Sequence, residues 1–328
     1  MGIQDDYRAI REAAALVVAH DRARIGLSGR DRATYLQGLL TNDIPALGPG
    51  SGCYAAWLTP QGRMTTDLHV LESGDMMLLE VPAATRESVL QRLDQFLFSE
   101  DVQLGDLTAA LGEVDVHGPR AADTIEQTIA GAGGLATWAP YQNARVDFAG
   151  SPVVVARIDR LGVPGFTLYV EAARELDLVG ALERAGASRV GSEAVEIARV
   201  EAGYPLFGVD MTEDTIPLEA GIENRAISLT KGCYVGQEVI IRVLHRGHGR
   251  VVRRLVGLRA GGDAPPRGAR IHGGGREIGT VTSAVVSPRF GAIALGYVHR
   301  DFVEPGTAVE IDTDTGRTPA VVSALPFA

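Results

Sequence analysis

From about residue 250 to its end, the sequence is divided into short Val- and Ile-rich runs by Gly, Pro and Asp residues. The runs lie at residues 251–258, 278–286, 292–298 and 307–311. Runs of this length form strands rather than helices, and their fairly regular spacing is typical of a small β-barrel or sandwich. We therefore predict that residues 246–328 form a separate C-terminal domain, an antiparallel β-barrel.

Residues 1–245 have a different pattern, in which helical and strand periodicities alternate. Helices are predicted over residues 3–20, 31–39 and 84–98, and from Gln237 onwards. Strands are predicted over residues 25–28, 113–117, 152–158 and 165–170, with a hairpin of 54–58 and 67–71 around Pro60-Gln-Gly-Arg. This region therefore looks like α+β material. Because a single hydrophobic core rarely serves as many as 328 residues, we expect two or three subdomains in the chain.

Bulk composition excludes several classes of protein. Hydrophobic residues make up 45% and charged residues 22%, as in globular proteins, and the net charge of −10 disfavours general nucleic-acid binding. The apolar stretch at 13–19 is too short to cross a membrane, and acidic residues precede it, so we expect neither a membrane span nor an export signal. Cys53 and Cys233 are too far apart to indicate a disulfide framework or a stable metal site. A reducing cytoplasm is the expected location.

The segment with the most unusual chemistry is Lys231-Gly-Cys-Tyr-Val-Gly-Gln-Glu. Cys233 lies between two glycines and just before a predicted helix start, with Lys231 close by. This positive potential favours the reactive thiolate, so Cys233 is a candidate functional thiol and Lys231 the residue that tunes it. We expect Gln237 and Glu238 to hold the loop by hydrogen bonds at the helix start. The alternative is that Cys233 is a small buried side chain.

These residues carry a resemblance to a known family. Lys231-Gly-Cys-Tyr-Val-Gly-Gln-Glu resembles the K-G-C-Y-x-G-Q-E signature of YgfZ proteins at every fixed position. Arg199-Val-Glu-Ala-Gly-Tyr-Pro-Leu-Phe-Gly and Pro217-Leu-Glu-Ala-Gly are similar to segments of the glycine-cleavage T-protein superfamily. The resemblance covers most of the chain, from Leu39-Leu-Thr-Asn-Asp to Pro305-Gly-Thr.

The resemblance implies a fold and a cofactor. T-proteins form a ring of three subdomains around a central hole that holds tetrahydrofolate. The resemblance therefore implies that residues 1–245 are the folate-binding region and form two interlocked α+β subdomains. By residue matching, Arg199, Tyr54 and Asp67 are candidate folate contacts, and we add Tyr234, Gln237 and Glu238 of the thiol motif. Without a ligand role, Arg199 would form an interdomain ion pair, Tyr54 would belong to the core and Asp67 would cap a turn.

Two departures from the T-protein pattern bear on activity. Thr66-Asp67 stands where T-proteins carry two adjacent acidic residues, and Val163 replaces a glutamate that grips the pterin. An aliphatic side chain cannot replace a charge-assisted hydrogen bond, which is worth roughly 1.5–3 kcal/mol. These departures disfavour aminomethyl transfer.

The sequence therefore predicts a tetrahydrofolate-binding accessory protein that supports assembly or repair of iron–sulfur enzymes, including those that thiolate tRNA. Its expected partners are folate and iron–sulfur client or assembly proteins, with Cys233 as a possible transient cluster ligand. The alternative is a tetrahydrofolate-dependent aminomethyltransferase or demethylase that uses Asp67 as its acid–base group. A third hypothesis is a scaffold with a vestigial folate hole.

Three smaller features have ordinary explanations. The basic stretch from Arg242 to Arg254 could bind a folate tail or an acidic partner, or it could be a solvated helix end followed by an edge strand. His245 and His248 alone are weak evidence for a metal site. Cys53, beside a predicted strand start, is expected to be packed in the core.

Overall fold

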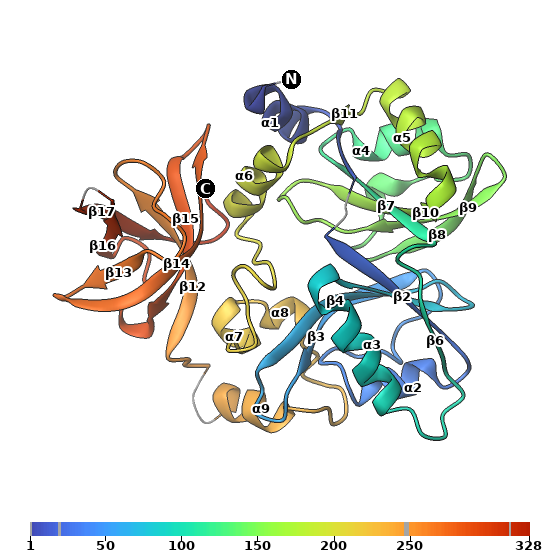
Figure 1. Cartoon of the computed structure of the whole chain (residues 1–328), viewed down its shortest axis with the longest axis horizontal. Helices are drawn as coiled ribbons and strands as arrows, with labels where there is room; N and C mark the ends of the chain where they lie inside the picture. The colour runs from blue at the N-terminus through green and yellow to red at the C-terminus, as the bar shows by residue number, and fades with distance from the viewer. Residues whose placement is uncertain (1, 19–20, 246–248, 315) are drawn as a thin grey trace.

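The computed structural model describes residues 2–18, 21–245, 249–314 and 316–328. Three lobes are arranged around the middle of the molecule (Figure 1). Two lobes are built on sheets from the N-terminal part of the chain, one antiparallel and one antiparallel except for a parallel edge strand, and the third is a closed barrel at its C-terminal end. The fold class predicted from the sequence is therefore confirmed.

The first lobe is a five-stranded antiparallel sheet in the order β3-β4-β5-β2-β6. Its strands are β2 (Arg22–Ser28), β3 (Ser51–Leu58), β4 (Met64–Glu72), β5 (Met77–Pro82) and β6 (Gln103–Asp106). Its helices are α2 (Arg32–Gln37), η1 (Ala83–Thr85) and α3 (Arg86–Gln95). The predicted hairpin is β3–β4, and the glycine of its turn, Gly62, adopts φ 75°.

The second lobe is a six-stranded sheet in the order β11-β1-β7-β10-β9-β8. Its strands are β1 (Ala15–Val18), β7 (Leu111–His117), β8 (Asn143–Phe148), β9 (Ser151–Arg157), β10 (Gly165–Glu171) and β11 (Ser188–Arg189). Its helices are α1 (Ile3–Glu12), α4 (Ala121–Thr128), η2 (Leu135–Thr137), η3 (Ala172–Arg174), α5 (Glu175–Arg184) and α6 (Ser192–Ala202). The predicted strands at 113–117, 152–158 and 165–170 correspond to β7, β9 and β10.

One predicted helix is wrong in its second half. The helix expected over 3–20 ends at Glu12, and Ala15–Val18 form strand β1, which pairs antiparallel with β7. Consecutive residues Ala14, Ala15 and Leu16 are all buried, on both faces of the strand. A continuous apolar run of this kind suits a central strand, whereas an amphipathic helix needs a polar face.

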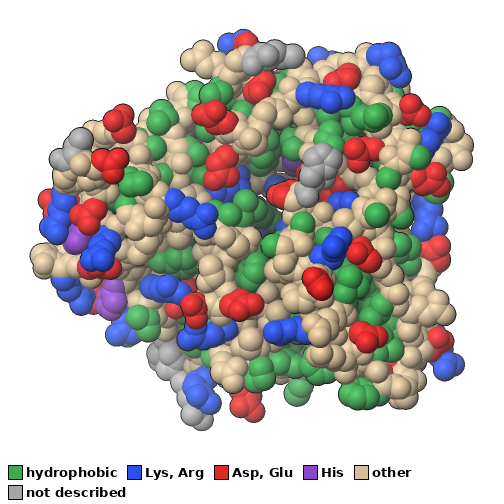
Figure 2. All heavy atoms as spheres, in the orientation of Figure 1, with side chains coloured by type: hydrophobic (Ala, Val, Ile, Leu, Met, Phe, Trp, Pro, Cys, Tyr) green, Lys and Arg blue, Asp and Glu red, His purple; other side chains and the backbone are tan. Residues whose placement is uncertain are grey.

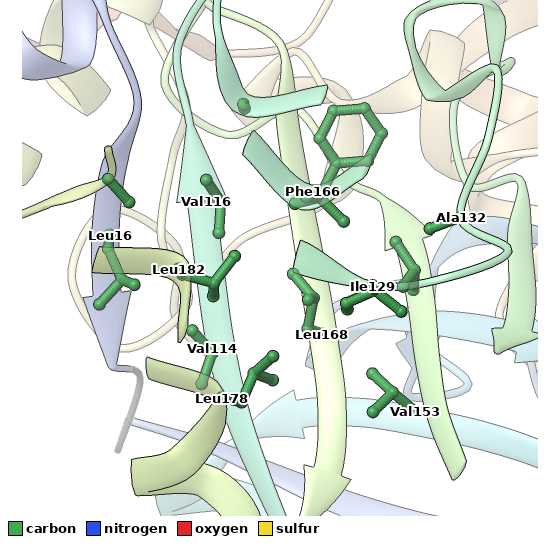
Figure 3. Packing of buried hydrophobic residues seen from close by; sticks show 14 of the residues in the cluster. Leu16, Val114, Val116, Ile129, Ala132, Val153, Phe166, Leu168, Leu178 and Leu182 are labelled. Atoms are coloured by element: carbon green, nitrogen blue, oxygen red, sulfur yellow. The ribbon is translucent and has the colours of Figure 1, made fainter. Parts of the chain in front are cut away.

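Strand alternation gives each sheet one apolar and one polar face. On β7, Val114 and Val116 pack under helices α4 and α5 in the cluster of Figure 3. On β4, Leu68 and Val70 pack into the separate core of the first lobe. The residues between these positions point to the opposite face of each sheet, as the period of two requires. These second faces are polar but also buried, and they meet at the centre of the molecule.

A connecting region leads from the second lobe to the barrel. It contains α7 (Pro217–Ala220), α8 (Glu223–Ala226) and α9 (Gln237–His245). Its apolar residues share one core with Tyr54 and Leu58 of β3, so this region packs on the first lobe. Cys53, on the other face of β3, is buried, as predicted.

The barrel closes in the order β12-β15-β14-β13-β16-β17, with β17 bonded back to β12. Its strands are β12 (Arg253–Ala260), β13 (Arg270–Gly273), β14 (Arg276–Ser287), β15 (Gly291–His299), β16 (Ala308–Thr313) and β17 (Gly316–Ser323), with η4 at Arg300–Phe302. The four predicted runs correspond to β12, β14, β15 and β16. The sequence did not indicate β13, which is four residues long, or β17, which mixes polar and apolar residues.

The surface agrees with the acidic composition. In Figure 2, basic and acidic side chains are interspersed over the visible face, and no broad basic patch is seen there. Within the described ranges, no helix is long and apolar enough to cross a membrane.

The barrel is joined to helix α6 through buried polar side chains. Arg199 on α6 donates to Asp210 Oδ2 (2.7 Å) and to Ser283 Oγ of β14 (2.8 Å). Asp210 Oδ1 in turn accepts from Thr282 and Ser283. The fully buried carboxylate of Asp210 thus links helix α6 to barrel strand β14, which is distant from α6 in the sequence.

We predict that Arg199→Met lowers the free energy of unfolding by about 3–5 kcal/mol, because it leaves the buried carboxylate of Asp210 without its cation. Urea unfolding followed by circular dichroism measures the change. The double variant Arg199→Met/Asp210→Asn is expected to recover much of the loss, since it removes the uncompensated charge. Equal stability of Arg199→Met and the wild type would contradict this role.

Candidate functional site

The polar faces of the two sheets enclose a cavity of about 430 Å³. Its walls come from β1, β2, β4 and β7, from the loop after β9, and from α6 and the segment that follows it. The lining side chains are Val17, Val18, Asp21, Arg22, Asp67, His69, Asp115, His117, Arg160, Leu161, Ser192, Val195, Glu196, Arg199, Tyr204 and Leu206. This mixture of apolar surface and a few convergent polar groups is typical of a small-molecule site.

Asp67 contributes a buried carboxylate to the wall of this cavity. The Tyr54 hydroxyl donates to Asp67 Oδ2 at 2.8 Å. Oδ1 is buried and has no hydrogen-bond partner among the described residues, and the nearest cation, Arg22 Nη1, is 4.0 Å away. Because a buried acceptor without a donor is costly, Asp67 Oδ1 is suited to accept a hydrogen bond from a ligand.

Thr66, beside Asp67, points away from the cavity. Its hydroxyl lies 3.0 Å from Thr85 Oγ1, on the face of β4 that packs under α3. Adjacent strand residues face opposite sides, so a carboxylate at position 66 would not lie in the cavity. The departure at Thr66 therefore does not weaken the case for chemistry at Asp67, and this part of the sequence argument is wrong.

His69 is a site residue that the sequence analysis missed. It follows Asp67 by two residues on β4, so both side chains lie on the same face of the strand. Its Nε2 lies 3.4 Å from the Tyr204 hydroxyl. Burial lowers the pKa of His69, and the charge of Glu80 acts in the opposite direction. The Asp-x-His spacing on a buried strand was the signal that could have found it.

A cluster of buried charges forms the floor of the cavity. Glu80 on β5 accepts from Arg160 at 2.5 and 2.7 Å, from Tyr169 at 2.8 Å and from Arg22. Asp115 on β7 accepts from Arg160 at 3.1 Å. Arg22 and Arg160, which both line the cavity, are therefore already neutralised by carboxylates of the two sheets.

Arg199 lines the cavity, but its donors are occupied. Besides Asp210 and Ser283, it donates to Glu196 and to the Tyr204 carbonyl. These contacts include the ion pair with Asp210, which agrees with the alternative prediction that Arg199 forms an interdomain ion pair instead of a folate contact. Arg199 therefore forms part of the cavity wall, and a contact between its guanidinium and a ligand stays a prediction.

The thiol motif forms a loop on the first lobe, and Cys233 is exposed on it. Lys231 Nζ donates to the carbonyls of Gln37, Leu40 and Asn42 at 2.6–2.8 Å. Tyr234, the residue after Cys233, is buried in the core that contains Tyr54, and Lys231 Nζ lies 5.1 Å from the centre of its ring. Burial of Cys233 as a small core side chain is therefore excluded.

Lys231 acts as a structural anchor of this loop. Burial lowers the pKa of Lys231 to about 8, although the charge of Asp43 acts in the opposite direction. Burial raises the pKa of Cys53 to about 12. Since its ammonium group points to three carbonyls of the first lobe, the proximity of Lys231 to Cys233 in the sequence does not translate into a contact. The prediction that Lys231 tunes Cys233 is not supported by this geometry.

Gln237 and Glu238 do not hold the loop as predicted. In the described part of the chain, neither side chain has a hydrogen bond; only the Gln237 backbone N–H bonds, to the Tyr234 carbonyl at 3.2 Å. Gly236 instead fixes the turn, with φ 85° and a backbone so close to the β3–β4 turn that a Cβ would lie 2.5 Å from the Thr59 carbonyl oxygen. A larger residue would push the loop off the hairpin.

The structure therefore brings Asp67 and Arg199 to one cavity. Tyr54 lies behind Asp67 in the core and contacts it there, but it is not among the lining residues. The lining also does not include Cys233, Tyr234, Gln237 or Glu238. Within the described residues, no group of three potential metal ligands occurs, and His248 lies outside those residues. In the basic stretch, Arg253 pairs with Glu219 and Arg254 pairs with Glu223.

We predict that Lys231→Met lowers the free energy of unfolding by at least the roughly 1.5–3 kcal/mol of one hydrogen bond to a charged group, because three carbonyls lose their donor. The iodoacetamide reaction rate of Cys233 at pH 7 should stay within about twofold of the wild-type rate. Thermal unfolding and mass-spectrometric alkylation measure the two effects. If the alkylation rate of Cys233 fell much further in Lys231→Met while the free energy of unfolding stayed unchanged, Lys231 would tune the thiol after all.

Comparison with known proteins gives matches along almost the whole chain. Residues 1–231 match the GCVT N-terminal domain, and residues 253–328 match the glycine cleavage T-protein C-terminal barrel domain. An aminomethyltransferase of Rubrobacter xylanophilus is 32% identical, covering 99% of this chain and 86% of the relative. One from Saccharopolyspora erythraea is 31% identical, covering 98% of this chain and 89% of the relative.

A solved structure agrees with these matches. The crystal structure of glycine cleavage system aminomethyltransferase T from Bartonella henselae superposes with a TM-score of 0.89 at 24% identity, covering 100% of this chain and 90% of that one. At this identity the likeness shows the fold. Together, the two domain matches and the relatives above 30% identity show that the chain belongs to the glycine-cleavage T-protein family.

Proposed function

We propose that the central cavity binds tetrahydrofolate or a derivative of it. The supporting observation is Asp67, whose buried Oδ1 has no hydrogen-bond donor in the described residues. A pterin ring offers neighbouring N–H groups at one edge and two flat apolar faces, and a carboxylate beside apolar walls complements both. Val17, Val18 and Leu161 provide such walls.

Within the T-protein family, we propose the YgfZ-type role: a folate-binding accessory protein for iron–sulfur enzymes, with Cys233 as its functional thiol. The observation that carries this proposal is how the loop is built. Lys231 and Tyr234, which flank Cys233 in the sequence, are buried, while Cys233 itself is exposed. A partner can therefore reach the thiol without any rearrangement of the loop. Two lone cysteines are compatible with a reducing cytoplasm as the compartment.

The second candidate is a folate-dependent aminomethyltransferase or demethylase, and two observations favour it. The curated relatives described above are aminomethyltransferases. In addition, Asp67 retains a free carboxylate oxygen in the cavity, where it could move a proton or stabilise a developing cation on a bound one-carbon unit. This role requires no thiol, so Cys233 distinguishes the two candidates.

We predict that Asp67→Asn weakens tetrahydrofolate binding about 10- to 150-fold, the loss equivalent to one charge-assisted hydrogen bond of roughly 1.5–3 kcal/mol. Isothermal titration calorimetry on the folded variant measures it. Thr66→Val is the matched control, because its side chain lies on the opposite face of the same strand and should leave the affinity unchanged. Equal losses in both variants would refute the assignment of the ligand to this cavity.

We further predict that Cys233→Ser abolishes support of iron–sulfur enzymes in cells, while Asp67→Asn keeps a substantial part of it. Serine remains protonated at neutral pH and is a harder ligand than a thiolate. Thiolated tRNA in a strain lacking its own YgfZ protein provides the readout, and Cys53→Ala controls for loss of a thiol elsewhere. An active Cys233→Ser together with an inactive Asp67→Asn would assign the function to one-carbon transfer, where loss of an acid–base group typically costs 10²–10⁴-fold in rate.

A further inference from the structure

Tyr204 is held firmly in the wall of the central cavity. Arg199 Nη1 donates to its carbonyl at 2.7 Å, and the Arg225 guanidinium lies 4.1 Å from the centre of its ring. Its hydroxyl lies 3.4 Å from His69 Nε2. The backbone, the ring and the hydroxyl of Tyr204 are therefore all positioned by other residues, so the side chain presents a preorganised group to a ligand.

The polarity of the contact between Tyr204 and His69 follows from Glu80. His69 Nδ1 lies 3.3 Å from Glu80 Oε2, and the Glu80 carboxylate is held ionised by hydrogen bonds from Arg160 and Arg22. A carboxylate repels a nitrogen lone pair and attracts an N–H, so the hydrogen of a neutral imidazole belongs on Nδ1. Burial lowers the pKa of His69 below its ordinary value, although the charge of Glu80 acts in the opposite direction, so the neutral ring prevails at pH 7.

With its hydrogen on Nδ1, the ring of His69 presents a lone pair at Nε2. The Tyr204 hydroxyl is then the donor in the contact between the two side chains. Across the described ranges, no N–H or O–H donates to the Tyr204 hydroxyl oxygen, so its lone pairs stay available. Asp67 Oδ1, from the same strand as His69, is likewise an acceptor without a donor in those ranges. These two groups of the cavity therefore both call for a donor on the ligand.

We propose that Tyr204 is a specificity-determining residue of the central cavity: its oxygen accepts a hydrogen bond from a ring N–H of the ligand, and the chain from Glu80 through His69 keeps it from donating. This inference deepens the proposed folate function and rests on it, because it names the property by which the cavity selects the reduced pterin ring over the oxidised one.

The selectivity follows from the chemistry of the ring. In tetrahydrofolate both nitrogens of the reduced ring carry hydrogen, whereas in folic acid the same nitrogens carry only lone pairs. Folic acid therefore places an acceptor against the Tyr204 oxygen, and each is left without a donor. A site built to hydrogen-bond one group rejects an analogue that lacks it, because the buried polar atom stays unpaired. His69 is a positioning residue in this scheme, since it acts on the ligand through Tyr204.

The test compares tetrahydrofolate with folic acid by anaerobic titration calorimetry on the full chain. Wild type is expected to bind tetrahydrofolate about 5- to 150-fold more tightly, the cost of one unpaired buried acceptor. Tyr204→Phe, which keeps the ring, should weaken tetrahydrofolate about 2- to 13-fold, the equivalent of one neutral hydrogen bond, and should not weaken folic acid. His69→Phe should act from the other side: the Tyr204 hydroxyl becomes free to turn and donate, so the affinity for folic acid rises while that for tetrahydrofolate stays within about twofold.

A matched control removes a tyrosine hydroxyl elsewhere. Tyr297→Phe changes a residue of barrel strand β15 that does not line the central cavity, and it should keep the full preference for tetrahydrofolate. Circular dichroism checks that each variant is folded. If His69→Phe does not fold, Tyr204→Phe decides the question, because its ring still fills the same space.

The outcomes separate this inference from the proposed function. Equal affinities of wild type for the two folates, or a preference that Tyr204→Phe leaves intact, would overturn the role of Tyr204 while the folate function stands. If wild type binds neither folate, the folate function fails, and the polarity of the contact is tested alone by nitrogen NMR of histidine-labelled protein. A His69 tautomer with hydrogen on Nδ1 would support Tyr204 as an acceptor, and hydrogen on Nε2 would overturn it.

Discussion

The two sheet lobes depend on a buried ionic contact across their polar faces. Glu80 of the first sheet is fully buried and accepts hydrogen bonds from Arg160 and Tyr169 of the second lobe and from Arg22 of its own sheet. Burial opposes its ionisation, but the charges of Arg160 and Arg22 prevail and hold the pKa of Glu80 well below its usual range. Removing one member of such a cluster leaves its partners charged and unsolvated, so the cluster fixes how the lobes meet.

The same cluster sets the electrostatics of the central cavity. Burial, together with the charges of Glu80 and Asp115, raises the pKa of Glu113 well above its usual range. Glu80 and Asp115 remain ionised beside Arg160, so the floor of the cavity carries opposed charges that largely cancel. Asp67 and Arg225 both contact Tyr54: Asp67 accepts a hydrogen bond from its hydroxyl, and the Arg225 guanidinium stacks over its ring.

Much of the architecture could be predicted because its signals are local or carried by motifs. The hairpin turn at Gly62, the strands β7, β9 and β10, and the barrel runs follow from residue patterns, and the family segments indicated a ring of subdomains. The site was harder to predict. Glu113-Val-Asp-Val-His alternates as a half-exposed strand would, and nothing local reveals that its polar face is buried under a second sheet. Lys231 was misjudged for the same reason: its three acceptors lie on a turn almost two hundred residues earlier in the chain.

Helix α1 carries a consequence for synthesis of the chain. Tyr7 and Arg11 both donate to Glu201, which also accepts from Ser287 of the barrel, so the first helix is seated by residues made much later. Glu201 follows Tyr7 by 194 positions, and at 5–20 residues per second the ribosome takes roughly 10–40 s to produce it. During that interval Ile10 and its apolar neighbours have no α6 to cover them. The apolar face of α1 therefore gains its cover only after most of the sheet lobes have been synthesised, so its docking on α6 is a late step of folding on the ribosome.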